Sequence, residues 1–248
     1  GAGRLLGGTT TGVSAIVLVS AFPNSGNFGI PVSEFAFGET GRATAVLYLT
    51  VQAVLMYTVG VYVASRSRAA SRAAVREVFR LPLVYAVVAA GLARWLDLLP
   101  TGTAMETIRT TGDAAIPVML LILGIQLSRT RRSAVAAAAT PTALKLLAAP
   151  VAGVAVVLVL SFDAPVVART FVLACAAPTA ITPLILAIEY DDADATPDDD
   201  PPDVGSSRHG RAPVSLPDYV GAAVFASTLG SVPTLTVLLW ALQSGVVV

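Results

Sequence analysis

Long uncharged stretches alternate with short charged segments along the whole chain. Five stretches are long enough to cross a membrane as a helix, since a hydrocarbon core of about 30 Å takes roughly 20 residues at about 1.5 Å each. They are residues 5–33, 43–65, 146–162, 170–188 and 219–248. Two shorter stretches, 81–93 and 114–128, need flanking residues to span. The pattern predicts an all-α integral membrane protein with about seven spans.

Composition supports this class of protein. Hydrophobic residues make up 55% of the 248 residues and charged residues 13%, about half the charged share of soluble domains. The formal net charge is zero, and no nucleic-acid partner is expected. The single cysteine, Cys175, lies in an apolar stretch and is expected to pack as a small apolar side chain. The chain begins at Gly1 without a basic n-region, so we expect further sequence to precede it.

The distribution of arginines predicts the orientation of the spans. Loops on the cytoplasmic side carry an excess of positive charge. The loops after the second and fourth spans hold five and three arginines, against four in the alternate loops: Arg66, Arg68, Arg72, Arg76, Arg80, Arg129, Arg131 and Arg132 against Arg42, Arg94, Arg109 and Arg169. We therefore expect a multi-pass protein of the cell membrane, with arginine-rich loops in the cytoplasm and the C-terminus outside.

Residues 190–217 combine many acidic side chains and prolines with almost no large apolar side chain. Such a segment cannot bury a core, and we predict a disordered cytoplasmic loop. Its aspartates lack the ligand spacing of a calcium loop, and the only histidine, His209, lies there too. We expect no metal site, no cofactor and no catalytic serine–histidine pair, so the chain is not predicted to be an enzyme.

Helix-breaking residues interrupt the first uncharged stretch near its middle. Irregular backbone at membrane depth persists only inside protein or beside a cavity, because an unpaired amide or carbonyl costs several kcal/mol in hydrocarbon. The motif FPNSGNFGIP therefore predicts a broken helix within a bundle, where Asn24 and Asn27 offer uncharged donors and acceptors. The predicted break residues are Pro23, Gly26, Gly29 and Pro31.

A second segment, CAAPTAITPLILAIEY, repeats this design with Pro178 and Pro183 flanking Thr179 and Thr182. Two ordinary proline kinks are the alternative interpretation. Two broken helices, each followed by an uninterrupted span, are typical of secondary transporters with inverted repeats. In that arrangement the broken helices cross near the midplane, and their positive N-terminal ends favour an anion between them.

The motifs FPNSGNFGIP, FGETGRA and VQAVLMYTVGVYVASR resemble the fourth and fifth helices of the auxin efflux carrier family, and APTAITPLILAIEY with VFASTLGSVPTLTVLLWAL resembles its ninth and tenth. The resemblance implies a fold of ten helices in two inverted repeats, related to bile-acid symporters and sodium/proton antiporters, with the first three helices absent. It places the end of the first repeat in residues 1–64, a basic loop in 65–80, and the second repeat, including 190–217, in 81–245.

The resemblance also implies which residues form the site. Asn24 matches the family's crossing asparagine, which is implicated in holding a substrate carboxylate, whereas capping of the following half-helix is the alternative. Asn27, Thr179 and Thr182 are further candidates for substrate contact. Gln52 matches a glutamine of plant relatives and is either a substrate ligand or a polar contact between helices.

Several charged residues lie within or next to the predicted spans. Lys145 lies one turn into its span, and we expect its ammonium to snorkel to the cytoplasmic surface. Glu34 follows the first break and is either functional or solvated at the interface. Glu106, Arg109 and Asp113 share one helical face and predict an interfacial turn.

Together these features predict a secondary transporter of small organic anions that works by alternating access, with an elevator-like movement of the crossing helices. The family resemblance implies carboxylates, such as auxin in plants and malate or malonate in bacteria. The alternatives are a cation-coupled symporter of the bile-acid type and a non-transporting membrane sensor or fragment. The expected partners are the anion and the lipid bilayer. The oligomeric state stays open, with a homodimer as one alternative.

Overall fold

The computed structural model describes residues 10–60, 79, 82–129, 138–180, 182 and 216–246, and every named element within these ranges is a helix. Of the predicted regions, 65–80 lies outside the described residues except for Phe79, and 190–217 lies outside them except where the last helix begins. The helices are α2 (Thr10–Ala21), η1 (Ser25–Gly29), α3 (Ile30–Leu55), η2 (Met56–Gly60), α6 (Pro82–Trp95), α7 (Thr103–Arg129), α8 (Ala139–Ala143), η3 (Leu144–Ala148), α9 (Ala149–Leu160), α10 (Pro165–Ala176) and α12 (Leu216–Gln243).

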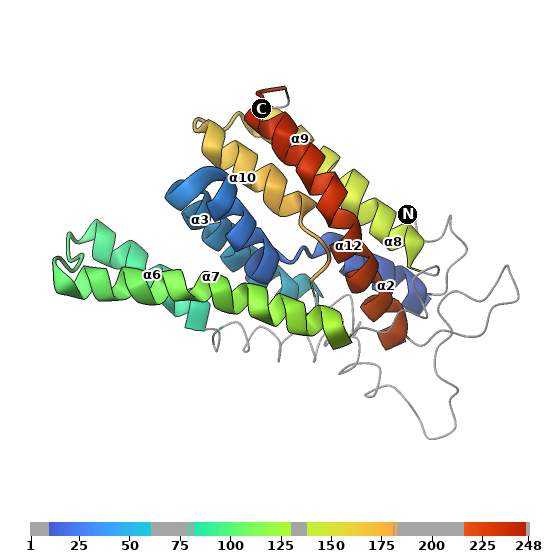
Figure 1. Ribbon diagram of the computed structural model, residues 1–248, viewed down its shortest axis with the longest axis horizontal. Coiled ribbons are helices and arrows are strands. Elements are labelled where there is room, and N and C mark those ends of the chain that lie inside the picture. The colour runs from blue at the N-terminus through green and yellow to red at the C-terminus, as the bar shows by residue number, and fades with distance from the viewer. Residues whose placement is uncertain are drawn as a thin grey trace, which may run out of the picture.

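The first broken helix consists of α2, a short extended break, the π-helical segment η1 and the first part of α3. Gly38 then adopts φ 65° and ψ −154° and kinks α3 sharply, which places the turn where charged residues separate the first two predicted spans. The two halves of α3 lie side by side in Figure 1. Gly41 allows this close return, since a Cβ at this position would lie 2.4 Å from the Ser33 carbonyl oxygen.

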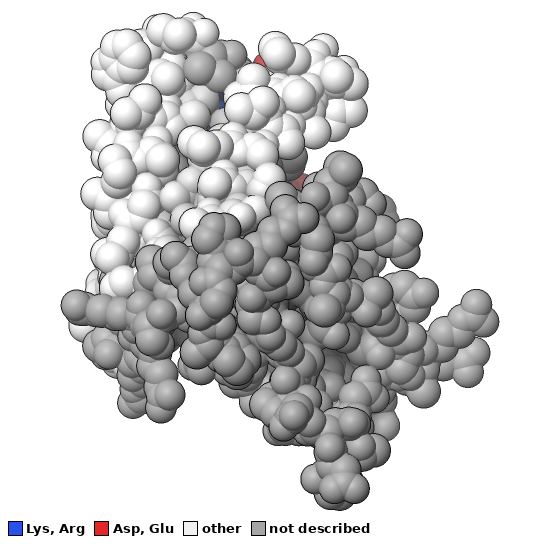
Figure 2. Space-filling view, turned by 90° about the vertical axis from the view of Figure 1, so that its right-hand side faces the viewer, with Lys and Arg blue, Asp and Glu red and all other residues white. Residues whose placement is uncertain are grey.

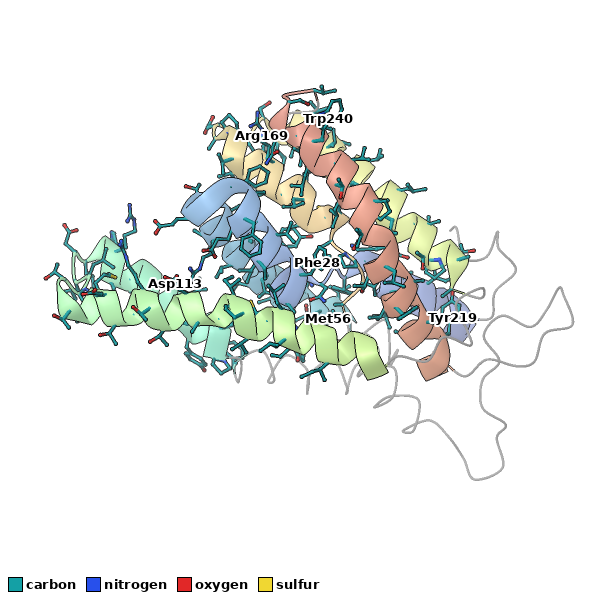
Figure 3. The ribbon with its side chains drawn as sticks, viewed as in Figure 1. Phe28, Met56, Asp113, Arg169, Tyr219 and Trp240 are labelled. Atoms are coloured by element: carbon teal, nitrogen blue, oxygen red, sulfur yellow. The ribbon has the colours of Figure 1, made fainter. Side chains whose placement is uncertain are left out.

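The later helices pack around this hairpin. α8, η3 and α9 follow one another without a break, and α10 lies between α9 and α3 while α12 contacts α2, α8 and α10. A core cluster of buried apolar side chains joins α9, α10 and α12, with Phe28 and Val32 of the first broken helix packed against it. Figure 3 shows Phe28 and Met56 toward the centre of the bundle and Trp240 near its edge. The core therefore ties the two broken helices together.

The helices α6 and α7 run along one side of this bundle (Figure 1). α6 contacts α3, whereas α7 contacts both α3 and η1. No residue of α6 is buried, so its apolar side chains are exposed or half-buried over the described part of the chain. The apolar part of the contact between α7 and α3 is a cluster of Ile30, Ala45 and Ile116, with Val46, Leu49 and Met119 packed against it.

The outer surface suits a lipid environment. Three helical segments, Ser25–Gly60, Ala139–Leu160 and Tyr219–Gln243, are long and apolar enough to cross a membrane, and Pro82–Trp95 and Pro165–Ala176 are shorter apolar helices. Large apolar side chains such as Val159, which is 80% exposed, cover the outside, and the face in Figure 2 shows almost no charged atoms over its described residues. Such a surface would be an aggregation liability in water. The structure thus confirms an all-α, multi-pass membrane protein over its described residues, with one helix broken at Pro23 and a second, α10, that ends just before Pro178.

Candidate functional site

The two broken helices meet at their breaks. Pro23 and Thr179 form an antiparallel bridge, so residues 22–24 and 178–180 run past each other as two short extended segments. The flanking hydrogen bonds run from the Asn24 amide to the Pro178 carbonyl at 2.6 Å and from the Ala180 amide to the Phe22 carbonyl at 3.0 Å. Backbone groups released by one break therefore satisfy those released by the other, as membrane depth requires.

Proline fits this bridge for a specific reason. Pro23 lies opposite Thr179 at a position where the pairing takes its hydrogen bonds from the neighbouring residues, so the missing proline N–H leaves no gap. The Thr179 amide is satisfied separately by the Ser227 hydroxyl of α12 at 3.0 Å. The backbone on both sides of the Pro23–Thr179 bridge is thus hydrogen-bonded without a proline N–H.

Three other predicted break residues lie in helical backbone instead. Gly26 and Gly29 belong to η1, and Gly29 has φ −65° and ψ −44°. Pro31 lies in the first turn of α3, directly after η1. The unwound segment is therefore shorter than expected, because the π-helical turn accommodates the glycines. Pro183 lies outside the described residues.

Side chains from other elements satisfy the carbonyl ends of both broken helices. The last carbonyls of a helix have no partner within it. The Thr179 hydroxyl donates to the Val19 carbonyl of α2 at 2.9 Å. The Lys145 ammonium donates to the Cys175 carbonyl of α10 at 3.1 Å, and its charge also suits the negative end of the helix dipole. One break thus has a neutral cap and the other a cationic one.

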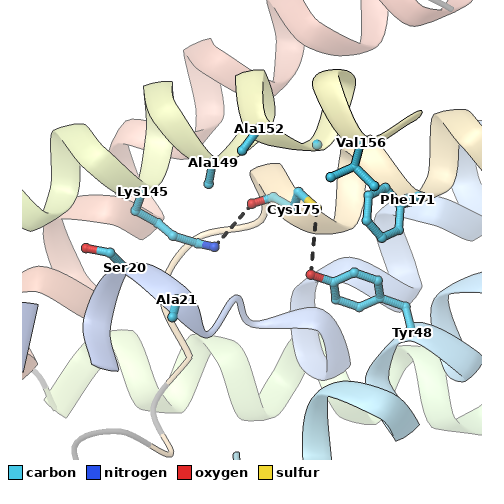
Figure 4. Close-up of a pocket in the computed structure, with 10 residues that line it drawn as sticks. Ser20, Ala21, Tyr48, Lys145, Ala149, Ala152, Val156, Phe171 and Cys175 are labelled. Carbon is cyan, nitrogen blue, oxygen red and sulfur yellow. Dashed lines mark hydrogen bonds between the residues drawn. The ribbon is translucent and has the colours of Figure 1, made fainter. Parts of the chain in front are cut away.

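The expectation that Lys145 snorkels to the surface is wrong. Its side chain is only 1% exposed, because the π-helical turn η3 directs it toward the end of α10 rather than along α9. Figure 4 shows its ammonium beside a cavity of about 240 Å³. The Ser20 hydroxyl beside it is buried without a hydrogen-bond partner among the described residues. The cavity is lined by Ser20, Ala21, Tyr48, Lys145, Ala149, Ala152, Gly153, Val156, Phe171 and Cys175.

Gln52 holds the first break in place. The Ser25 hydroxyl donates to Gln52 Oε1 at 2.5 Å, and Gln52 Nε2 donates to the Pro23 carbonyl at 2.6 Å. Gln52 is 9% exposed and Ser25 is 1% exposed. Both ends of this amide therefore contact the unwound segment from the second half of α3.

The remaining candidates lie close to the crossing. Asn24 is 8% exposed and precedes η1, but its side chain makes no capping hydrogen bond, so the capping alternative does not account for it. Asn27 is partly buried in η1, and Thr182 is partly buried just beyond the second break. The structure brings Asn24, Gln52 and Thr179 together at the crossing.

The crossing therefore combines features that suit an anion. The N-terminal end of η1 begins at the bridge, which places the positive end of a helix dipole there. Asn24 adds a buried amide, and Lys145 adds a buried cation at the neighbouring helix end. Among the described residues, no group of three or more His, Cys, Asp or Glu side chains gathers where a metal ion would bind.

Sequence reasoning missed part of this arrangement. Ser25 and Ser227 carry no sequence signal beyond being small polar residues within spans. Lys145 did carry one, since it is the only lysine of the chain and lies inside an apolar stretch, where a charged residue is a functional hypothesis by default.

Comparisons with known proteins agree with this architecture. The family described as "Membrane transport protein" matches residues 2–196, which include both breaks. An "Uncharacterized transporter" of Methanothermobacter thermautotrophicus is 32% identical over 178 residues, covering 71% of this chain and 58% of the relative. The chain thus spans less than two thirds of that relative's length. No solved structure matches. The extent of the family match shows that this chain belongs to the membrane transport protein family.

Proposed function

We propose that this chain carries small organic anions, in particular carboxylates, across the membrane by alternating access. The observation that supports the proposal is the crossing of two broken helices at Pro23 and Thr179, beside the buried amide of Asn24. Secondary transporters of this design bind substrate where broken helices meet near the midplane. The crossing helices would move as a unit past α6 and α7, as in an elevator.

The charge of the site favours an anion over a cation. A carboxylate loses its hydration when it enters protein and needs donors in return. The amides at the start of η1 and the side chain of Asn24 would supply these donors, and Lys145 would supply compensating charge from the neighbouring helix end. In this proposal Asn24, Asn27 and Thr182 contact the substrate, while Gln52 and Thr179 position the breaks through their own hydrogen bonds.

Lys145 also bears on the rival proposal of a cation-coupled symporter. In such transporters the carbonyl ends of broken helices coordinate the coupling cation. Here the carbonyl end of α10 already receives the Lys145 ammonium at the Cys175 carbonyl. This contact supports a carrier that needs no sodium ion at this position. A sensor without transport has no comparable support.

Uptake into proteoliposomes tests the proposal. The purified protein is reconstituted, and radiolabelled mono- and dicarboxylates are offered outside in sodium, potassium or choline buffer. We expect uptake of at least one carboxylate, equal in the three buffers, and no uptake of its uncharged amide. Uptake that requires sodium would contradict the sodium-independent carrier, and uptake of no carboxylate would contradict the substrate class.

Orientation is a separate part of the proposal. The arginine-rich loops would face the cytoplasm of a cell-membrane protein and the C-terminus the outside. In a Cys175→Ser background, a membrane-impermeant maleimide applied to intact cells should label Thr101→Cys, between α6 and α7, and spare Ser71→Cys. The reverse pattern would invert the topology.

A further inference from the structure

Three charged side chains meet where α3 contacts α7. Arg42 Nη1 lies 2.6 Å from Asp113 Oδ1 and 3.5 Å from Glu34 Oε2. Glu34 and Arg42 belong to α3, on either side of the kink at Gly38, whereas Asp113 belongs to α7. Figure 3 shows Asp113 on the side of α7 toward α3. Arg42 thus lies between an acid of its own hairpin and an acid of another helix.

The Glu34 side of this cluster is fixed to Arg42. Gly41 packs so closely on Ser33 that a Cβ there would also lie 2.7 Å from the Phe37 Cβ atom, so the turns bearing Glu34 and Arg42 are held together. Glu34 Oε2 is buried and has no hydrogen-bond partner among the described residues. Any movement of this hairpin would therefore carry along a carboxylate oxygen ready to accept from Arg42.

The Asp113 side is fitted to the same guanidinium. Arg42 Nη2 lies 2.8 Å from where a Cβ on Gly112 would be, so the guanidinium lies directly against the α7 backbone. Asp113 is the charge of α7 next to its uncharged stretch 114–128. Besides this ion pair, α3 and α7 share an apolar cluster around Ile30, Ala45 and Ile116. The ion pair thus adds a polar contact between the same two helices.

We propose that Arg42 is a partner-exchanging latch between the crossing helices and α7. In the described conformation its short contact is with Asp113, at 2.6 Å against 3.5 Å to Glu34, and this contact holds the two parts together. When the crossing helices move past α7, the guanidinium loses Asp113 and closes onto Glu34. The exchange keeps the charge of Arg42 paired throughout, which avoids an unpaired charge at the membrane boundary. This latch rests on the proposed alternating access, because that mechanism requires the movement.

Distances between spin labels report the two states without any substrate. Leu47 on α3 and Ile108 on α7 are 56% and 57% exposed. Both are replaced by cysteine and labelled in a Cys175→Ser background, with the protein in lipid nanodiscs. Pulsed electron paramagnetic resonance then gives the ratio of the latched conformation to the displaced one.

The two acids should act in opposite directions. Asp113→Asn removes the partner in the latched state and should lower its ratio to the displaced state by about five-fold, the upper range for a partly exposed ion pair. Glu34→Gln removes the partner in the displaced state and should raise the same ratio. Asp113→Glu keeps the charge and should stay near the parent. Glu106→Gln, two turns earlier on α7, is the matched control and should change nothing.

A latch is overturned if Asp113→Asn leaves the ratio unchanged, if both neutralised acids shift it in the same direction, or if every variant shows a single distance. Because no substrate is present, this outcome is independent of the cargo. If the protein takes up a carboxylate but Asp113→Asn and Glu34→Gln leave the ratio of the two conformations unchanged, the latch alone is rejected. If the two variants shift this ratio in opposite directions but no carboxylate is taken up, the proposed substrate is rejected and the latch stands.

Discussion

Replacing Gln52 by leucine should loosen the first break without changing the apolar packing around it. Gln52 accepts from the Ser25 hydroxyl and donates to the Pro23 carbonyl, and leucine can do neither. The Pro23 carbonyl keeps a contact from the Ser25 amide at 2.9 Å. The Ser25 hydroxyl, in contrast, is left buried without its acceptor.

The size of the effect follows from these contacts. Hydrogen bonds between membrane helices contribute about 0.6 kcal/mol on average, and an orphaned buried hydroxyl costs about 1 kcal/mol or more. Gln52→Leu should therefore lower the free energy of unfolding by about 2 kcal/mol. For a chain of this size that corresponds to a fall in Tm of about 4–8 °C.

Thermal unfolding of the purified protein in detergent, supported by SDS-induced unfolding, measures this change. Ser25→Ala should cost about 1 kcal/mol by itself. The double variant of Gln52 and Ser25 should lose about 1 kcal/mol less than the sum of the single variants, because no hydroxyl is then orphaned. Fully additive losses of stability, or an unchanged Tm in Gln52→Leu, would refute the proposed role of the Gln52 hydrogen bonds in holding the first break.

Further predictions concern the hairpin and the cationic cap. Gly41→Ala should destabilise the protein by about 1–3 kcal/mol because the added Cβ meets the Ser33 carbonyl. The control Gly124→Ala, with open space around it, should leave Tm unchanged in the same thermal assay. Equal effects of the two variants would contradict the close packing at Gly41. Lys145→Met should abolish carboxylate uptake while the protein remains folded by circular dichroism, because the Cys175 carbonyl and the bound anion both lose the ammonium. Full uptake in Lys145→Met would remove that residue from the site.

The positions of the breaks were predictable in part, because proline has no N–H to donate and so weakens a helix locally. Pro23 and Pro178 lie at the breaks, whereas Pro117 and Pro233 lie inside the continuous helices α7 and α12, so proline alone does not decide where a helix ends. Gly26 and Gly29 were misjudged because glycine permits irregular backbone without requiring it, and a π-helical turn accommodates both. The membrane class was equally readable, as was a turn somewhere between the first two spans, since both follow from where charges interrupt apolar stretches.

The contacts across the breaks were not predictable in the same way. The pairing of residues 22–24 with 178–180 joins segments far apart in the chain, and only the packed bundle sets its register. Lys145 shows the same limit. The sequence around a lysine one turn into a span is the same whether its side chain points toward the surface or into the bundle. Here the end of α10, which lies nearby only in the folded protein, provides the inward partner. The contacts of Gln52 with the break also depend on the kink at Gly38, because the kink brings the second half of α3 back beside the unwound segment.

Direct binding tests the central claim, that the crossing holds a carboxylate. The transported carboxylate is titrated into purified wild type, Asn24→Ala and the control Thr236→Val, and Tm is followed. The exposed Thr236 hydroxyl donates to the Val232 carbonyl of its own helix. A ligand that binds only the native state must raise Tm. We predict a rise for wild type and Thr236→Val and none for Asn24→Ala at an unchanged starting Tm; an equal rise in all three would contradict an anion site at the crossing.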